Sequence, residues 1–168
     1  MFSEKDIVLF TELLKRYLLD YYKNILFRDK VKNYSERIRL FCFCILDNHF
    51  HLLLQQLDKN AMNEFLQSLQ VSFTAFINRR NGRSGHLFES VYKARMMENE
   101  VDLAATSKYI HLNPDPKDAK GCLNYPYSSI YNYVPGSYNS WEFVDNSRIL
   151  RLFNNSKKDY LTYISTRA

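Results

Sequence analysis

The feature that most restricts the fold of this chain is a pair of apolar stretches joined by two turn-forming residues. Residues 39–46 are an almost continuous apolar run, which is typical of a β-strand covered on both faces. Asp47 and Asn48 follow, and both residue types favour tight turns. Residues 49–55 then form a second stretch rich in leucine. The sequence therefore predicts two neighbouring antiparallel strands closed by a hairpin turn.

Two histidines, His49 and His51, flank Phe50 at the start of the second stretch. Side chains alternate between the two faces of a strand, so the imidazoles share one face while Phe50 points to the other. Imidazoles at this spacing can chelate one divalent metal ion. The same spacing also occurs on strands that carry two surface histidines and no metal, so the spacing alone leaves both interpretations open.

Three helices are predicted from the helical spacing of apolar residues. They cover residues 3–21, 60–81 and 99–113, and each opens on a Ser or Asn, residue types that commonly cap helices. The third helix is expected to end at its last residue because Pro114 disfavours helical geometry in the residue before it.

The remaining segments are less regular. Residues 23–37 are charged and irregular, which favours a loop, and residues 87–97 alternate in a way that predicts a further strand. From residue 115 to about 140 the chain is rich in turn-forming residues, and residues 149–164 form a last amphipathic segment.

Length and composition indicate one domain. A chain of 168 residues with 46% apolar residues can build a single core but not two of ordinary size. We therefore expect one domain over residues 1–168, with residues 115–168 as its C-terminal extension. Three cysteines without a C-x-x-C pair favour neither a disulfide framework nor a zinc knuckle. No signal peptide and no apolar run of ~18 residues are visible, so a cytoplasmic protein without membrane contact is expected.

A second chemical motif is Tyr109-Ile110-His111-Leu112-Asn113-Pro114. Residues four apart share a helix face, so Tyr109 and Asn113 are neighbours while His111 points elsewhere. If this helix lies over the histidine face, Asn113 can offer a third metal ligand beside the Tyr109 hydroxyl. Such a neutral ligand set suits an exchangeable Mg²⁺ or Mn²⁺ better than a structural zinc. By spacing alone, a tyrosine that simply packs the helix fits equally well.

The order of the motifs resembles that of the REP-associated tyrosine transposases, relatives of the single-tyrosine HUH transposases of small bacterial insertion sequences. The resemblance rests on residues 48–51, on the Gly82-Arg83-Ser84-Gly85-His86-Leu87-Phe88 segment and on residues 109–114. Tyr125-Pro126-Tyr127-Ser128-Ser129 is also similar to a motif of that family. The likeness extends from about Phe2 into the C-terminal segment.

The resemblance implies a fold, a chemistry and a substrate. The expected fold is α/β, with a ferredoxin-like antiparallel sheet and helices packed on one face. His49 and His51 would be metal ligands, Tyr109 the nucleophile and Asn113 the third ligand, with Mg or Mn as the divalent metal. Such enzymes cut single-stranded DNA beside a hairpin, hold a 5′-phosphotyrosine link and rejoin the strand. The wider group contains dimers and monomers, so a homodimer is one expected state.

Basic residues flank the three motifs and suit contacts to DNA phosphates. The net charge of +5 permits a polyanionic partner, and phosphate contacts would position a strand without specifying its sequence. The candidates for DNA binding are Arg79, Arg80, Arg83, Lys93, Arg95 and Lys108.

The chain departs from the family pattern in three places. Asp47 occupies a position where proline is usual, and Glu89 and Val91 occupy positions where polar or basic residues are common. In addition, a helix follows Ser3 at once, whereas relatives already have an opening strand before it. We therefore expect the sheet to lack the family's first strand. The edge of the histidine strand would then be covered by a second copy or by the C-terminal segment, or catalysis would be impaired. The alternative is a fold in which residues 24–34 of the same chain close this edge.

Two other functions stay open at the level of sequence. The chain could be a catalytically impaired or domesticated protein that binds DNA hairpins with the same fold. It could also be a metal phosphoesterase in which water attacks the phosphate and Tyr109 only positions the substrate.

Overall fold

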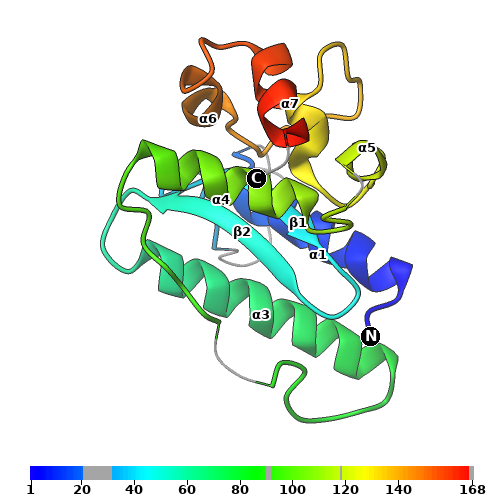
Figure 1. Ribbon diagram of the computed structural model, residues 1–168. Coiled ribbons are helices and arrows are strands. Elements are labelled where there is room, and N and C mark those ends of the chain that lie inside the picture. Colours follow the sequence, from blue (N-terminus) through cyan, green and yellow to red (C-terminus); the bar gives the residue numbers. More distant parts are fainter. Residues whose placement is uncertain (21–31, 90–91, 118, 167–168) are drawn as a thin grey trace.

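The computed structural model describes residues 1–20, 32–89, 92–117 and 119–166. Within these ranges, two antiparallel strands lie between helices, which is the predicted α/β class (Figure 1). The elements are α1 (Glu4–Leu18), β1 (Ile38–Ile45), β2 (Phe50–Gln56), α3 (Ala61–Arg80), α4 (Glu100–Leu112), α5 (Ala119–Cys122), the 3-10 helix η1 (Ser129–Tyr133), α6 (Ser147–Arg151) and α7 (Lys157–Ser165).

The predicted hairpin is confirmed. The Leu46 N–H donates to the His49 carbonyl at 2.8 Å, so Asp47 and Asn48 are the two turn residues between the strands. Ile45 is paired with Phe50. Neither turn residue adopts a positive φ, so the turn forms without the backbone conformation that suits both residue types. Cys42 and Cys44 are buried in β1, as the apolar run predicted.

Helices cover both faces of the strand pair. On one face the Phe50 ring lies 4.7 Å from that of Phe10 in α1, and Phe10 lies 5.2 Å from Phe73 in α3. On the other face the ring of His51 lies 5.3 Å from that of Tyr109 in α4. The expected packing of helices on one face is thus formed by α1 and α3, and α4 crosses the opposite face, running against the direction of β2 (Figure 1).

Two of the predicted helix starts are confirmed by their caps. The backbone N–H and the hydroxyl of Ser3 both donate to the Asp6 carboxylate, which closes the first turn of α1. The Asn99 side chain accepts from the Asp102 N–H at the start of α4. At the start of α3, Asn60 occupies the cap position with φ 69° and makes no side-chain cap hydrogen bond.

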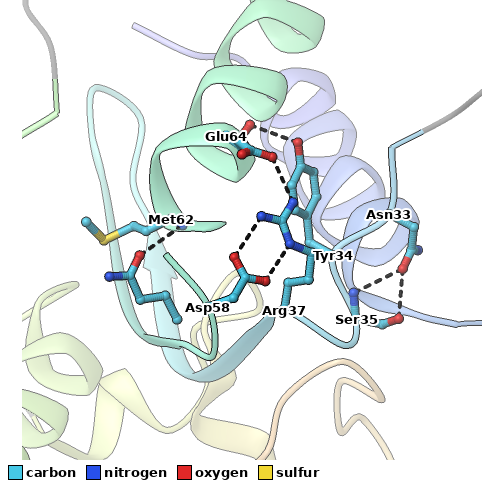
Figure 2. A network of polar contacts seen from close by, with 8 residues as sticks. Asn33, Tyr34, Ser35, Arg37, Asp58, Met62 and Glu64 are labelled. Atoms are coloured by element: carbon cyan, nitrogen blue, oxygen red, sulfur yellow. Dashed lines mark hydrogen bonds and ion pairs between the residues drawn. The ribbon is translucent and has the colours of Figure 1, made fainter. Parts of the chain in front are cut away.

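A polar network at the far end of the hairpin ties the strands to α3 (Figure 2). The Arg37 guanidinium, just before β1, pairs with Asp58 at 2.6 Å and with Glu64 at 2.7 Å. These contacts lower the pKa of both carboxyl groups. The buried Tyr34 hydroxyl donates to the Glu64 carbonyl at 3.0 Å. The network therefore fixes where β2 passes into α3, at the end of the strand opposite the histidines.

The C-terminal segment lies against the outer edge of β1. Ser128 forms an isolated bridge with Cys44, and the Ile45 N–H donates to the Tyr127 carbonyl at 2.9 Å. Further along, Val144 forms a bridge with Leu40. The C-terminal segment therefore covers the edge of β1 and does not supply the strand expected beside β2, which has no strand partner on its outer edge within the described residues.

Three predictions about elements are wrong in their extent or type. The first helix ends at Leu18 rather than at residue 21, and residues 21–31, including most of the predicted loop, lie outside the described residues. The described part of 87–97 runs without strand pairing, because it is separated from β2 by a cleft. Between residues 115 and 140 two short helical elements, α5 and η1, form where turns were expected, and the predicted amphipathic segment is divided into α6 and α7. No helix in the described ranges is long and apolar enough to cross a membrane.

Candidate active site

A cleft of about 1620 Å³ opens beside β2. Residues of β2, of the segments 87–89 and 92–97, and of the sides of α3 and α4 that border the gap form most of its walls. The α3 side is mostly apolar, with Met62, Leu66 and Ile77 beside the polar Gln70. The cleft therefore brings residues from several parts of the chain to the strand beside the histidines.

The two histidines lie together at the hairpin end of this cleft. Their ring centroids are 4.9 Å apart and the rings are perpendicular, as expected for residues on one strand face. His49 is exposed, and its Nδ1 lies 2.6 Å from Asn48 Oδ1. Because a carboxamide oxygen only accepts, Nδ1 of His49 carries the proton and Nε2 is left with its lone pair.

His51 is half-buried and its Nε2 has no hydrogen-bond partner among the described protein atoms. Burial, together with the neighbouring His49, lowers the pKa of His51, which keeps the ring neutral at neutral pH. A buried nitrogen without a partner carries a cost in free energy unless a ligand engages it. The two Nε2 atoms thus fit a pair of ligands to a divalent metal ion.

Tyr109 approaches the histidines from α4. Its ring centroid is 5.3 Å from that of His51, with the planes at 81°. The side chain is 57% exposed, so water and substrate can reach the hydroxyl. The structure therefore brings together three of the four residues predicted for the site: His49, His51 and Tyr109.

Asn113 is placed at the end of α4, where it is the C-cap residue and half-buried. It is not among the residues that line the cleft. Since α4 runs against β2, Asn113 lies one helical turn beyond Tyr109 in the direction of the hairpin turn (Figure 1). Its role as third ligand stays a prediction. Across the described residues, no group of three or more His, Cys, Asp and Glu side chains is placed to hold a metal ion.

Three of the predicted DNA-binding residues line the cleft: Arg83, Lys93 and Arg95. All three are exposed. Arg83 donates to the His86 carbonyl at 3.1 Å, and Arg95 pairs with Asp102 of α4 at 2.7 Å. The cleft therefore has basic side chains on the side that faces β2 across the gap.

The other three predicted DNA-binding residues lie elsewhere. Arg79 and Arg80 are at the end of α3, and Arg80 forms an ion pair with Asp6 of α1. The Lys108 ammonium donates to the carbonyls of Tyr163 and Thr166 at 3.2 Å and 2.6 Å, at the end of α7. Arg80 and Lys108, like Arg95 in the cleft, thus have partners within the chain, which makes them less available to a phosphate.

One buried polar residue near the site, His111, was not assigned a role by the sequence. It is fully buried, its Nδ1 lies 2.6 Å from the Tyr160 hydroxyl and its Nε2 2.8 Å from the Ser129 hydroxyl. Burial lowers the pKa of His111 to about 3. The only sign of this in the sequence is a histidine between the apolar Ile110 and Leu112.

Comparisons with known proteins give one match. A family model described as "Transposase IS200 like" matches residues 8–113, which is more than half of the chain and includes His49, His51 and Tyr109. Searches of curated proteins and of solved structures return no match.

Proposed function

This chain belongs to the IS200-like transposase family of DNA-processing enzymes, and from that premise we propose that it cleaves and rejoins single-stranded DNA beside hairpins. In this proposal Tyr109 becomes linked to the 5′-phosphate of the cleaved strand, and a divalent metal, Mg or Mn, is required. DNA is thus the substrate, and the cleft beside β2 is where we expect the strand to bind.

The observation that carries the proposal is the convergence of three side chains from two elements. His51 comes from β2, His49 directly precedes that strand, and Tyr109 comes from α4, with neighbouring ring centroids 4.9 Å and 5.3 Å apart. A tyrosine hydroxyl is a weak nucleophile at neutral pH and needs an activating group beside it. Two imidazoles next to an exposed tyrosine supply a place for such a group.

The metal would be held by Nε2 of His49 and Nε2 of His51, with Asn113 as the proposed third ligand. A divalent ion supplies charge stabilisation and orients the phosphate for in-line attack. The protein contributes the rest of the geometry. Asn48 fixes the ring of His49 through its hydrogen bond at 2.6 Å, and burial keeps His51 neutral.

The chemical step assigns one bond change to Tyr109. Its oxygen forms a bond to phosphorus as the bond between phosphorus and the 3′-oxygen breaks. The phenolic proton passes to water, which reaches the exposed side chain, and the 3′-oxygen leaves as a hydroxyl. Rejoining reverses these steps with another 3′-hydroxyl, so no external energy source is needed.

The test is incubation of the purified protein with hairpin oligonucleotides labelled at either end, in Mn²⁺ or in EDTA. We expect the label on the 3′ side of the cut to migrate with the protein in a denaturing gel, and only with metal. The label on the 5′ side should be released with a free 3′-hydroxyl. Release of both fragments without a protein adduct would favour attack by water instead.

The first mutational prediction is that Tyr109→Phe abolishes the covalent adduct while the affinity for the hairpin is retained. Only the hydroxyl is removed, and the ring contact with His51 is kept. The control is Tyr163→Phe, which removes a hydroxyl from a half-buried tyrosine of α7 outside the cleft. Adduct formation by the Tyr109→Phe protein would contradict the assignment of the nucleophile.

A second candidate function is a DNA-hairpin-binding protein of the same family with impaired catalysis. The observation that favours it is the open outer edge of β2, beside which Tyr109 remains 57% exposed. When the catalytic side chains are held loosely, the rate of DNA cleavage falls even though the DNA still binds. Binding of the labelled hairpin without any cleavage, in Mg²⁺ and in Mn²⁺, would decide for this alternative.

A further inference from the structure

The helix that carries Tyr109 is anchored by an unusual set of buried residues. Four residues of α4 are buried, and two of them are polar: Ser107 and His111 accompany Leu103 and Ile110. Apolar contacts are non-directional and tolerate sliding, whereas hydrogen bonds fix distance and direction. The position of α4 along its axis therefore depends strongly on what Ser107 and His111 bind.

A chain of hydrogen bonds links these two residues to α7. The Ser107 hydroxyl donates to the Ala104 carbonyl at 2.8 Å, and the Tyr160 hydroxyl donates to Ser107 at 3.2 Å. The single proton of Tyr160 is thus used, so His111 Nδ1, at 2.6 Å from the same oxygen, is the donor to Tyr160. This accounting assigns His111 as the Nδ1–H tautomer.

The same chain continues to β1. In a fully buried neutral imidazole with a proton on Nδ1, Nε2 accepts, and the Ser129 hydroxyl lies 2.8 Å from it. The Ser129 oxygen in turn accepts from the Phe43 N–H at 2.8 Å. The alternative acceptor for the Ser129 proton, the Phe43 carbonyl, is further away at 3.2 Å.

These bonds close a loop around the candidate site. Phe43 is next to Cys44, and Cys44 is the cross-strand partner of His51. His111 is two residues from Tyr109, which meets His51 across the cleft. The distance between the tyrosine and the histidine is thus set by α4 on one side and by β1 on the other, with His111 and Ser129 joining them.

We infer that His111, Ser129 and Tyr160 are positioning residues, which hold Tyr109 against His51 through this hydrogen-bond chain. Ser129 and Tyr160 lie outside the region that matches the family model. The C-terminal segment therefore belongs to the working site, although none of these three side chains lines the cleft. The inference rests on the proposed function only in giving Tyr109 its chemical role.

The experiment compares Tyr160→Phe and Ser129→Ala, which break the chain at opposite ends, with Tyr163→Phe. Tyr163 is also on α7, and Phe at that position keeps the ring that packs beside Lys108. For each protein, the rate of adduct formation is measured at saturating hairpin DNA, and the Kd is measured by fluorescence anisotropy. Nuclear Overhauser effects between the rings of His51 and Tyr109 are recorded without DNA.

We expect both chain-breaking variants to form the adduct at least tenfold more slowly, with Kd changed less than twofold. The ring-to-ring effect between His51 and Tyr109 should weaken in both and stay unchanged in Tyr163→Phe. An unchanged ring-to-ring effect in both chain-breaking variants overturns the inference, as does an equal loss in Tyr163→Phe. If the wild type forms no adduct, the proposed function fails. The ring-to-ring effect between His51 and Tyr109 then tests by itself whether the three residues position Tyr109. Should Tyr160→Phe fail to fold, Ser129→Ala decides by the same criteria.

Discussion

The two histidines of the cleft have different surroundings although they are on the same strand face. His49 is exposed and fixed by Asn48, whereas His51 is half-buried with a free Nε2 and a lowered pKa. A ligand that is already neutral and already oriented loses little on binding a metal ion. The half-buried His51 is therefore the more pre-organised of the two ligands.

Replacing either histidine should remove activity with little effect on folding. His49→Ala and His51→Ala should each abolish metal-dependent cleavage, because Nε2 is lost while the packing of the strand is kept. Phe50, between them, is the matched control. It packs on Phe10 and Phe88, so Phe50→Ala should lower the free energy of unfolding by about 2–4 kcal/mol. Urea unfolding and the adduct assay would separate the two effects, and unfolding of the histidine variants would contradict the face assignment.

His111 should make stability depend on pH. Its pKa is lowered to about 3 in the folded protein, whereas an unfolded histidine titrates near ~6.5. Below that value the unfolded chain binds the extra proton, so stability is fully present above about pH 6.5 and is lost as the pH falls. Between pH 7 and pH 5 the loss from this residue should be about 2 kcal/mol.

The measurement is urea unfolding across this pH range for the wild type and for His111→Phe. The variant should be less stable at pH 7 but should show a smaller fall on acidification. His51, whose pKa is also lowered, contributes in the same direction and is unchanged in the comparison. Equal pH dependence in the two proteins would show that His111 does not titrate on unfolding.

At the scale of elements, α4 has two working faces. Tyr109 faces β2, and His111, about 200° round the helix, faces the C-terminal segment. Because the helix packs against β2 on one side and against the C-terminal segment on another, its apolar residues do not form one continuous stripe. The sequence did predict its limits, since the cap at Asn99 and the stop before Pro114 are local signals.

Other elements show which features can be predicted from neighbouring residues and which depend on residues far away in the sequence. The hairpin and the shared face of His49 and His51 could be predicted because they depend on neighbours in sequence. The strand predicted over 87–97 was wrong because alternation describes side chains, whereas a strand also needs a neighbour to bond. The partners of His111 are 18 and 49 residues away, so its role was not readable from its own segment.

The run of residues 87–97 also supplies a prediction about DNA binding. Lys93 lines the cleft and is exposed, whereas Lys108 is held by the carbonyls of Tyr163 and Thr166 at the end of α7. Lys93→Gln should weaken binding and reduce the salt dependence by about one counterion, and Lys108→Gln should change the slope little. Binding constants across a salt series would test this, and equal slopes for Lys93→Gln and the wild type would contradict it.

At the scale of the whole molecule, the two edges of the strand pair differ. The outer edge of β1 is bonded to the C-terminal segment, through Tyr127 to Ile45 and through Ser129 to Phe43. The outer edge of β2 faces the cleft and has no strand partner among the residues described. Because outward and inward amides alternate along an antiparallel strand, the N–H groups of Phe50 and Leu52 point into the cleft.

Hydrogen exchange should follow this asymmetry. The amides of Phe43 and Ile45 should exchange slowly, and those of Phe50 and Leu52 should exchange fast although all four belong to one hairpin. Mass spectrometry with fragmentation to single residues, or NMR, would measure the difference. Slow exchange at Phe50 and Leu52 in the protein alone would mean that the outer edge of β2 is covered in solution.

The uncovered outer edge of β2 also allows binding in the cleft to be detected from the exchange rates of its own amides. Anything that fills the cleft, whether a nucleic-acid strand or a stretch of polypeptide from another copy, must cover the amides of Phe50 and Leu52. Only a polypeptide strand would replace their bonds to water with a regular ladder, so it would slow both amides to the rate seen in β1. A DNA strand would shield them partially and in proportion to its affinity. The backbone amides on either side of His51 can therefore signal, without any label, what has entered the cleft.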